Sequence, residues 1–170
     1  MFSYINKIFS GSNTVSEKKL INFLIFQKGG EKNMQKINIL NGTDGVKSAY
    51  RLTLEADKLD IVCLTANYEK ITGDFFEKEY ALKLYGRVAT REILPDTLEN
   101  RQYAKSKDAA KNQVRFLALQ QTVDSDCMLA GDKIILVSYR ENNPYALVVE
   151  DRDLAANLQL QFNRLWESLK

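Results

Sequence analysis

The 170-residue sequence contains no histidine. This absence excludes Ser-His-Asp and Cys-His nucleophilic systems, histidine general bases and histidine metal ligands. Cysteine is also scarce, because Cys63 and Cys127 are the only two in the sequence and are too few for a four-ligand zinc site. Both lie in apolar, strand-like runs, so we expect buried thiols rather than a disulfide. Nothing in this cysteine usage suggests secretion.

Long hydrophobic runs and phosphate-binding glycine motifs are missing as well. No apolar stretch approaches the ~20 residues of a membrane span, and no apolar N-terminal core precedes a small-residue cleavage site. The sequence has neither Gly-x-x-x-x-Gly-Lys-Ser/Thr nor Gly-x-Gly-x-x-Gly. Its formal net charge of +2 gives no general attraction to polyanions. We therefore predict a cytoplasmic protein without a membrane span, a metal or a cofactor.

The composition, with 45% hydrophobic and 27% charged residues, is typical of one globular domain with a short appendage. Residues 1–33 are predicted to form a helical appendage that ends in a glycine-containing linker. Met34 follows directly and is a candidate internal start. We expect the appendage to pack against the domain or a partner copy, with a membrane-surface helix as the alternative. The main domain is assigned to residues 34–170.

From residue 36 onward, strand and helix patterns alternate and then give way to a meander of strands. Strand followed by helix, repeated, and then a meander predicts an α/β fold with a mixed β-sheet flanked by helices. The predicted strands span 37–40, 60–64, 91–94, 114–119, 125–130, 134–138 and 145–149. The predicted helices begin at 41–45, span 73–87, lie within 97–113, and span 150–169.

The predicted terminal helix has apolar residues along one stripe: Leu154, Leu158, Phe162, Leu165, Trp166 and Leu169. The stripe predicts that Phe162 and Trp166 anchor the helix to the core. A large aromatic pair is also a good interface anchor, so a dimer interface at these two residues is the alternative.

Polar residues follow the first two predicted strands, where ligands bind in open α/β sheets. They are Asn41, Thr43, Asp44, Thr65 and Asn67. The turn at 41–45 can bind an anion or a sugar hydroxyl, or it can be a plain helix entry that Thr43 or Asp44 caps.

Three arginines in the middle of the chain are further candidates. Arg87, Arg91 and Arg115 could face an anionic ligand or partner, since guanidinium groups bind carboxylates and phosphates. The alternative is a solvated, salt-bridged surface with Arg115 on an edge strand. Arg115 stands in the apolar run Val-Arg-Phe-Leu, where a charged group needs a partner.

Several short motifs occur in one order between Arg87 and Trp166: Arg-Val-Ala-Thr-Arg-Glu-Ile-Leu-Pro, Asn-x-Val-Arg-Phe-Leu, Gly-Asp-Lys-Ile-Ile, Val-Val-Glu-Asp-x-x-Leu and Phe-x-x-x-Trp. Their order resembles the C-terminal domain of TrmB-family transcriptional regulators, and Ile39-Leu-Asn-Gly-x-x-Gly-Val46 is similar to that family's strand and helix entry. The resemblance extends over about Lys36 to Leu169. It implies a phospholipase D-like sandwich that senses effectors, sugars in some members, and forms oligomers.

The resemblance also indicates which functions are missing. Active phospholipase D relatives use His-x-Lys, and the corresponding strand here holds Cys127-Met-Leu129 without a histidine. This implies the fold without the phosphodiesterase chemistry. Residues 1–33 are too few for the winged helix-turn-helix that precedes the domain in the regulators, so DNA binding by this chain alone is not expected.

The sequence therefore predicts a non-catalytic regulatory domain that senses a small effector, either a sugar or an anionic metabolite, or mediates oligomerisation. The expected partner is a second copy or a helix-turn-helix regulator. Two alternatives stay open. One is a hydrolase that uses paired carboxylates facing one cleft, and the other is a nucleic-acid-binding domain that uses the Arg/Lys-rich middle segment.

Overall fold

The computed structural model describes residues 36–65, 67–121 and 123–169. The predicted helical appendage of residues 1–33 and the candidate start at Met34 fall outside these described residues. The described residues belong to one compact unit.

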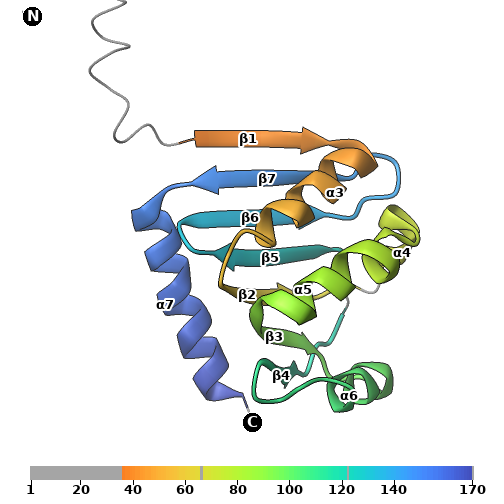
Figure 1. Ribbon diagram of the computed structural model, residues 1–170, viewed down its shortest axis with the longest axis vertical. Coiled ribbons are helices and arrows are strands. Elements are labelled where there is room, and N and C mark those ends of the chain that lie inside the picture. Colours follow the sequence, from red (N-terminus) through yellow and green to blue (C-terminus); the bar gives the residue numbers. More distant parts are fainter. Residues whose placement is uncertain (1–35, 66, 122, 170) are drawn as a thin grey trace, which may run out of the picture. The chain divides into compact units, whose positions relative to one another are not determined.

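A seven-stranded mixed sheet forms the centre of this unit (Figure 1). Its order is β1-β7-β6-β5-β2-β3-β4, in which β2, β3 and β4 are parallel and all other neighbours are antiparallel. The predicted mixed α/β fold is confirmed. The strands are β1 (Lys36–Asn41), β2 (Lys58–Cys63), β3 (Ala89–Pro95), β4 (Asn112–Leu117), β5 (Ser125–Ala130), β6 (Lys133–Ser138) and β7 (Tyr145–Glu150).

Helices cover both faces of the sheet (Figure 1). One face is covered by α3 (Gly42–Thr53), α4 (Tyr68–Thr72), the π-helical turn η1 (Phe76–Tyr80) and α5 (Ala81–Arg87). The other face is covered by α7 (Arg152–Ser168), while α6 (Leu98–Lys105) lies between β3 and β4 in the chain. Alternate residues of a central strand therefore enter two different cores.

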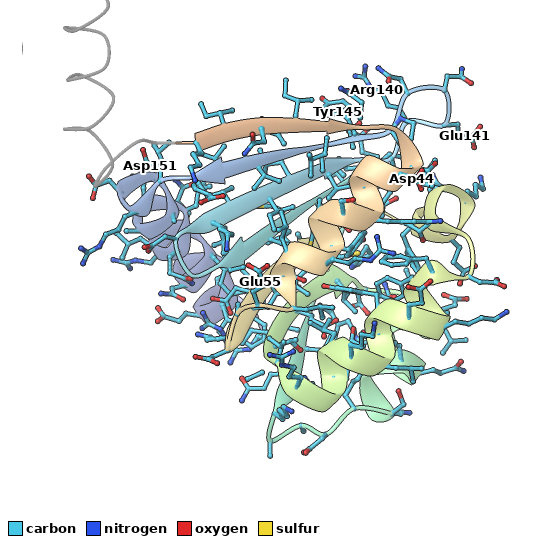
Figure 2. The ribbon with its side chains drawn as sticks, turned by 45° about the horizontal axis from the view of Figure 1, so that its top comes forward. Asp44, Glu55, Arg140, Glu141, Tyr145 and Asp151 are labelled. Atoms are coloured by element: carbon cyan, nitrogen blue, oxygen red, sulfur yellow. The ribbon has the colours of Figure 1, made fainter. Side chains whose placement is uncertain are left out.

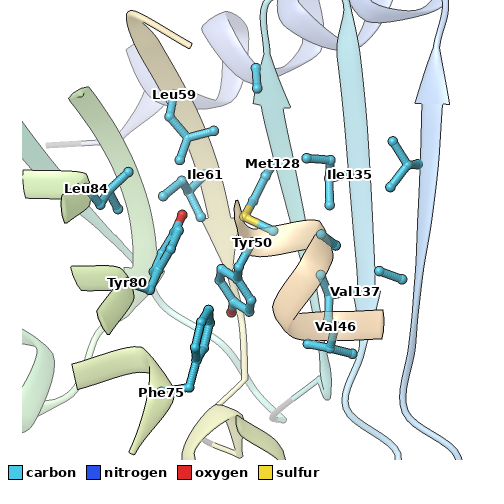
Figure 3. Packing of buried hydrophobic residues seen from close by; sticks show 14 of the residues in the cluster. Val46, Tyr50, Leu59, Ile61, Phe75, Tyr80, Leu84, Met128, Ile135 and Val137 are labelled. Carbon is cyan, nitrogen blue, oxygen red and sulfur yellow. The ribbon is translucent and has the colours of Figure 1, made fainter. Parts of the chain in front are cut away.

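The larger core lies under α3 and α5 (Figure 3). Leu59 and Ile61 of β2 point into it together with Met128 of β5, and Tyr50 and Tyr80 lie across from them. Each fully buried side chain of this size stabilises the fold by roughly 1.5–3 kcal/mol relative to exposure. The alternation also explains the continuous apolar run Ile61-Val62-Cys63 in β2, because Val62 packs into the second core on the opposite face.

The second core lies between the sheet and α7, whose N-terminus is capped by Asp151. The Asp151 carboxylate accepts hydrogen bonds from the backbone N–H groups of Asp153 and Leu154. Phe162 and Trp166 are 5% and 8% exposed and stack with ring centroids 5.8 Å apart, which confirms them as core anchors. The predicted stripe is wrong at Leu154, which is 52% exposed because Ala155 takes the inward position there.

The entry to α3 differs from the predicted cap. Asn41 occupies the N-cap position without a side-chain hydrogen bond, and neither Thr43 nor Asp44 caps the helix. Close approach of helix and strand explains the glycine at position 45. A Cβ atom there would lie 2.5 Å from the Leu40 carbonyl carbon, which is closer than real Cβ contacts allow.

The single helix predicted for residues 73–87 is also wrong in detail. Gly73 has a φ of +57°, which ends α4, and the chain then forms η1 before α5. In η1 the Ala81 N–H donates to the Phe76 carbonyl, five residues back. Such π turns occur often at functional sites, and here both Phe76 and Tyr80 line the cavity described next.

Candidate ligand pocket

The strand directions bring several strand ends to one edge of the sheet. β1 and β6 run the same way as β2, β3 and β4, so the C-terminal ends of these five strands and the start of β5 share this edge. A cavity of about 260 Å³ lies there beside β2 and β3. Its lining includes six aromatic side chains and three carboxylates: Tyr50, Tyr68, Phe76, Tyr80, Tyr85 and Tyr103, with Glu92, Glu99 and Asp126.

Asp126 of β5 is the carboxylate at the centre of one hydrogen-bond cluster. It is 5% exposed and accepts hydrogen bonds from the Tyr139 hydroxyl at 2.6 Å, the Leu64 N–H at 3.2 Å and the Tyr50 hydroxyl at 3.4 Å. The two tyrosine hydroxyls also bond to each other. Burial raises the pKa of Asp126 from its ordinary 3.8 to about 6, against the opposing effect of the Tyr139 hydrogen bond.

Glu92 of β3 is the central carboxylate of a second hydrogen-bond cluster that also contains two tyrosine hydroxyls. It is 3% exposed and accepts hydrogen bonds from the Thr90 hydroxyl at 2.8 Å, the Tyr103 hydroxyl at 3.0 Å and the Tyr85 hydroxyl at 3.4 Å. Burial raises the pKa of the Glu92 carboxyl, while the Thr90 hydrogen bond lowers it. Two carboxylates with raised pKa values in one cavity are typical of a functional site, although structural networks also produce them.

Aromatic rings form the wall between these clusters. Tyr50 and Tyr80 meet edge to face with centroids 4.7 Å apart, and Tyr68 and Phe76 also lie 4.7 Å apart. Among the described residues, no lysine or arginine lines the cavity. Outside the lining, the ammonium of Lys107 lies 3.0 Å from the centroid of the Tyr85 ring and 4.0 Å from that of Tyr103.

Two of the predicted site residues lie at this edge near the pocket. Thr65 is buried and lines the cavity, and Asn67 lies beside it. Both donate side-chain hydrogen bonds to the same oxygen of Asp124, from the Thr65 hydroxyl at 3.3 Å and from the Asn67 amide at 2.7 Å.

Asn41, Thr43 and Asp44 lie away from this pocket. They belong to β1 and the start of α3, and three strands separate β1 from β2 in the sheet. Figure 2 shows Asp44 at the surface, near the turn that carries Arg140 and Glu141. The predicted ligand role of these three residues stays a prediction, and the structure does not bring them together with Thr65 and Asn67.

The arginines are held by other interactions. The Arg91 guanidinium donates to both oxygens of Asp60, at 2.7 and 2.6 Å, and stacks on Phe162 and Trp166 at centroid distances of 4.9 and 5.5 Å. Arg115 lies on the edge strand β4 and donates to the backbone carbonyls of Trp166 and Leu169.

Arg91 and Arg115 therefore lie on the α7 face of the sheet, away from the pocket lining. Arg115 satisfies carbonyl groups at the C-terminal end of α7. Arg87 is exposed in the last turn of α5. The proposed roles of these three arginines in ligand binding stay predictions.

A second hollow, of about 300 Å³, lies at the other end of β2. Asp57, Asp60 and Gln159 are part of its lining. Asp60 is already paired with Arg91 and accepts a hydrogen bond from the Gln159 amide at 2.6 Å, so its charge is compensated. We therefore place the candidate site at the C-terminal edge.

Sequence reasoning missed Glu92, Asp126 and the tyrosines. A usable signal existed, because Glu92 and Asp126 both stand in apolar strand patterns, as Arg115 does. A buried carboxylate needs hydrogen-bond partners, and the same argument that singled out Arg115 applies to them. Their meeting in one cavity depends on β5 pairing with β2, which places Asp126 beside Cys63.

Two further properties concern only the residues that the structure describes. Among them, no three cysteine, aspartate or glutamate side chains are arranged to hold a metal ion. None of their helices is long and apolar enough to cross a membrane. Cys63 and Cys127 are both free thiols, as expected, and both are half-buried.

Comparison with known proteins gives similarity in structure only. No protein-family model and no curated protein sequence matches this chain. Among solved structures, Nuc from Salmonella typhimurium, a phospholipase D family member, has a TM-score of 0.55 at 8% identity over 81% of this chain and 97% of Nuc. NucT from Helicobacter pylori has a TM-score of 0.53 at 10% identity over 80% and 98%. This chain has a phospholipase D-like fold.

The third similar structure is that of TrmBL2. It is described as an archaeal chromatin protein with a novel mode of DNA binding, and it has a TM-score of 0.56 at 15% identity. The match covers 91% of this chain but only 62% of TrmBL2, so this chain spans less than two thirds of that protein. These matches fit the predicted TrmB-like, phospholipase D-like domain. A DNA-binding neighbour does not fit well with the expectation that this chain alone does not bind DNA.

Proposed function

We propose that this chain is a non-catalytic regulatory domain that binds a small molecule in the pocket at the C-terminal edge of the sheet. The observation that supports it best is the cavity of about 260 Å³, which has an aromatic wall and buried polar groups. Ligand sites in proteins are mostly apolar concave sites with a few placed polar groups, and this cavity is just under the ~300 Å³ at which typical drug-sized sites begin. The resemblance to TrmB-family regulators supports the regulatory role.

The absence of histidine supports the non-catalytic part of the proposal. The phosphodiesterase chemistry of the superfamily that the chain resembles uses a histidine nucleophile, which this sequence lacks. Asp126 and Glu92 accept hydrogen bonds from neutral hydroxyl and amide groups, an arrangement that holds them in place.

The proposal is tested by ligand-induced stabilisation. Thermal unfolding would be followed through Trp166, the only tryptophan of the chain, against sugars, nucleotides, phosphorylated metabolites and amines. A ligand at 100 times its Kd stabilises the folded state by about 2.7 kcal/mol. Tyr68→Ala, which removes part of the pocket wall, should abolish the shift. Leu82→Ala should retain it, because Leu82 is 72% exposed on α5 and does not line the cavity.

The outcomes separate the proposal from its alternatives. No stabilisation by any compound would count against ligand sensing. Turnover of a glycoside or phosphodiester that Asp126→Asn abolishes would instead support a carboxylate-dependent hydrolase, because Glu92 and Asp126 do face one cavity. A change of molecular mass in solution on ligand binding would support control of oligomerisation.

DNA binding is the second candidate function, and the structural similarity to TrmBL2 favours it. Retention on duplex DNA would be measured between 50 and 200 mM salt, a range over which proteins with 6–10 phosphate contacts lose roughly 10³–10⁵ in affinity. Binding that persists at physiological salt would support this function. Weak retention that disappears there would exclude it.

A further inference from the structure

The pocket has buried carboxylates without a direct ion-pair partner, and the ammonium of Lys107, outside the lining, only partly offsets the charge of Glu92 by lowering its pKa. Among the described residues, no lysine or arginine forms an ion pair with Asp126 or with Glu92, and the hydrogen-bond partners of both are neutral hydroxyl and N–H groups. By contrast, the buried Asp60 on the other face is paired with Arg91. Buried carboxylates without an ion-pair partner are costly, and a positively charged ligand would reduce that cost.

The walls of the pocket are suited to the same ligand. The faces of Tyr and Phe rings are negative and attract ammonium groups that lie within about 6 Å of the ring centroid. Tyr68 and Phe76 lie on one side of the cavity, and Tyr85 and Tyr103 lie near Glu92. Aromatic faces beside carboxylates are the usual surroundings of a bound organic cation.

The chain itself supplies a precedent for this chemistry. The ammonium of Lys107 lies 3.0 and 4.0 Å from the ring centroids of Tyr85 and Tyr103, the two tyrosines whose hydroxyls bond Glu92. Lys107 does not line the cavity, so this ammonium does not fill it. The contact shows that the rings of Tyr85 and Tyr103 accept a primary ammonium, while the rings of Tyr68 and Phe76 have no such contact among the described residues.

We propose that the pocket binds a small organic cation, a protonated amine whose ammonium group lies between the aromatic wall and the carboxylates of Asp126 and Glu92. The inference rests on the proposed function and names its ligand class. It replaces the anionic metabolite expected from the sequence, because an anion would meet two buried carboxylates without a lysine or arginine in the lining. A neutral sugar is the competing ligand.

The test uses probes of equal chain length and different charge. Butane-1,4-diamine is a dication at pH 8, since alkylammonium groups have pKa values near ~10. Butane-1,4-diol has the same carbon chain with neutral hydroxyl groups, and succinate has four carbons and two negative charges. Tetramethylammonium and glucose complete the panel. Isothermal titration calorimetry at low salt would measure each affinity.

We expect at least one cation to bind about tenfold or more tightly than the diol, a difference of about 1.4 kcal/mol, and succinate to bind more weakly still. Asp126→Asn and Glu92→Gln should each weaken cation binding by about tenfold or more. Asp132→Asn removes one negative charge from the exposed turn after β5 and should leave the affinity unchanged. If one pocket variant fails to fold, the other still decides the result.

The remaining outcomes are distinct from one another. Glucose or the diol binding as tightly as the cations would overturn this inference and leave the proposed ligand-sensing function intact. Cation binding that both pocket variants retain would place the cation elsewhere and also overturn it. No binding by any probe, together with no stabilisation across the wider panel, would remove the inference and the proposed function together.

Discussion

The raised pKa of Asp126 predicts a specific dependence of stability on pH. The folded state holds this proton more tightly than the unfolded chain, because ionisation leaves a charge buried among tyrosines. The stabilising contribution of the protonated group is fully present well below pH 4 and is lost as the pH rises through about 6. The pKa rises from 3.8 to about 6, and each unit corresponds to ~1.4 kcal/mol, so the loss is about 3 kcal/mol.

Asp126→Asn should remove this dependence, because the amide does not titrate. Urea unfolding followed by Trp166 fluorescence would give the free energy of unfolding of both proteins from pH 4 to pH 8. We expect the variant to gain about 2.5 kcal/mol relative to the wild type over this range, because part of the loss already occurs below pH 4. Carboxylates outside the pocket, such as Asp96 with its lowered pKa, affect both proteins equally and cancel in the difference. Asp132→Asn should follow the wild-type profile.

The groups that surround Asp126 do not obscure the result. Burial raises the pKa values of Tyr50, Tyr139 and Cys63, so all three stay protonated between pH 4 and pH 8. Glu92 also has a raised pKa and is unchanged in the variant. A difference between the two proteins that stays constant within ~0.5 kcal/mol across the range would refute the reasoning.

Three further predictions concern the fold, and urea unfolding checks each of them. Phe162→Ala should cost about 3–5 kcal/mol by leaving a cavity under α7, whereas Leu160→Ala, 67% exposed on the same helix, should change stability by less than ~0.5 kcal/mol. Gly45→Ala should destabilise because its Cβ would collide with strand backbone, whereas Gly86→Ala has open space in α5 and should stabilise by about 0.4–1 kcal/mol. Arg115→Ala should cost about 1–3 kcal/mol because it leaves carbonyls at the end of α7 unpaired. Equal effects within either pair of variants would contradict the packing described, as would an Arg115→Ala variant of wild-type stability.

Local patterns were sufficient to predict most of the elements. The three strands of the meander depend on residues close together in sequence, and each is observed within one residue of its predicted bounds. The inner face of α3 follows from the spacing of Val46, Ala49 and Tyr50, which are all buried. Such features follow from periodicity alone.

The pocket was beyond that reasoning because pairing between distant strands creates it. The insertion of β5, β6 and β7 between β1 and β2 separates Asn41 from Thr65, which the sequence places after consecutive strands. The same insertion brings Asp126 beside Cys63. The order and register of strands in a sheet depend on the whole chain, and the hydrophobic pattern of a single strand does not determine which strands pair with it.

The sheet order also has a consequence for how the chain assembles. β1 precedes every other strand of the described unit, yet within that unit it pairs with β7 alone, where Lys36 lies opposite Glu150. During synthesis the backbone groups of β1 therefore cannot form these hydrogen bonds until β7, the last strand of the domain, has left the ribosome. Closing so long a loop is slow, and an unpaired strand edge invites wrong partners. Truncated chains that end before Tyr145 should thus be prone to aggregate, because β1 stays unpaired in them. The side chains of Ile37 and Ile39 add to this tendency, since they are 67% and 62% exposed even in the complete fold.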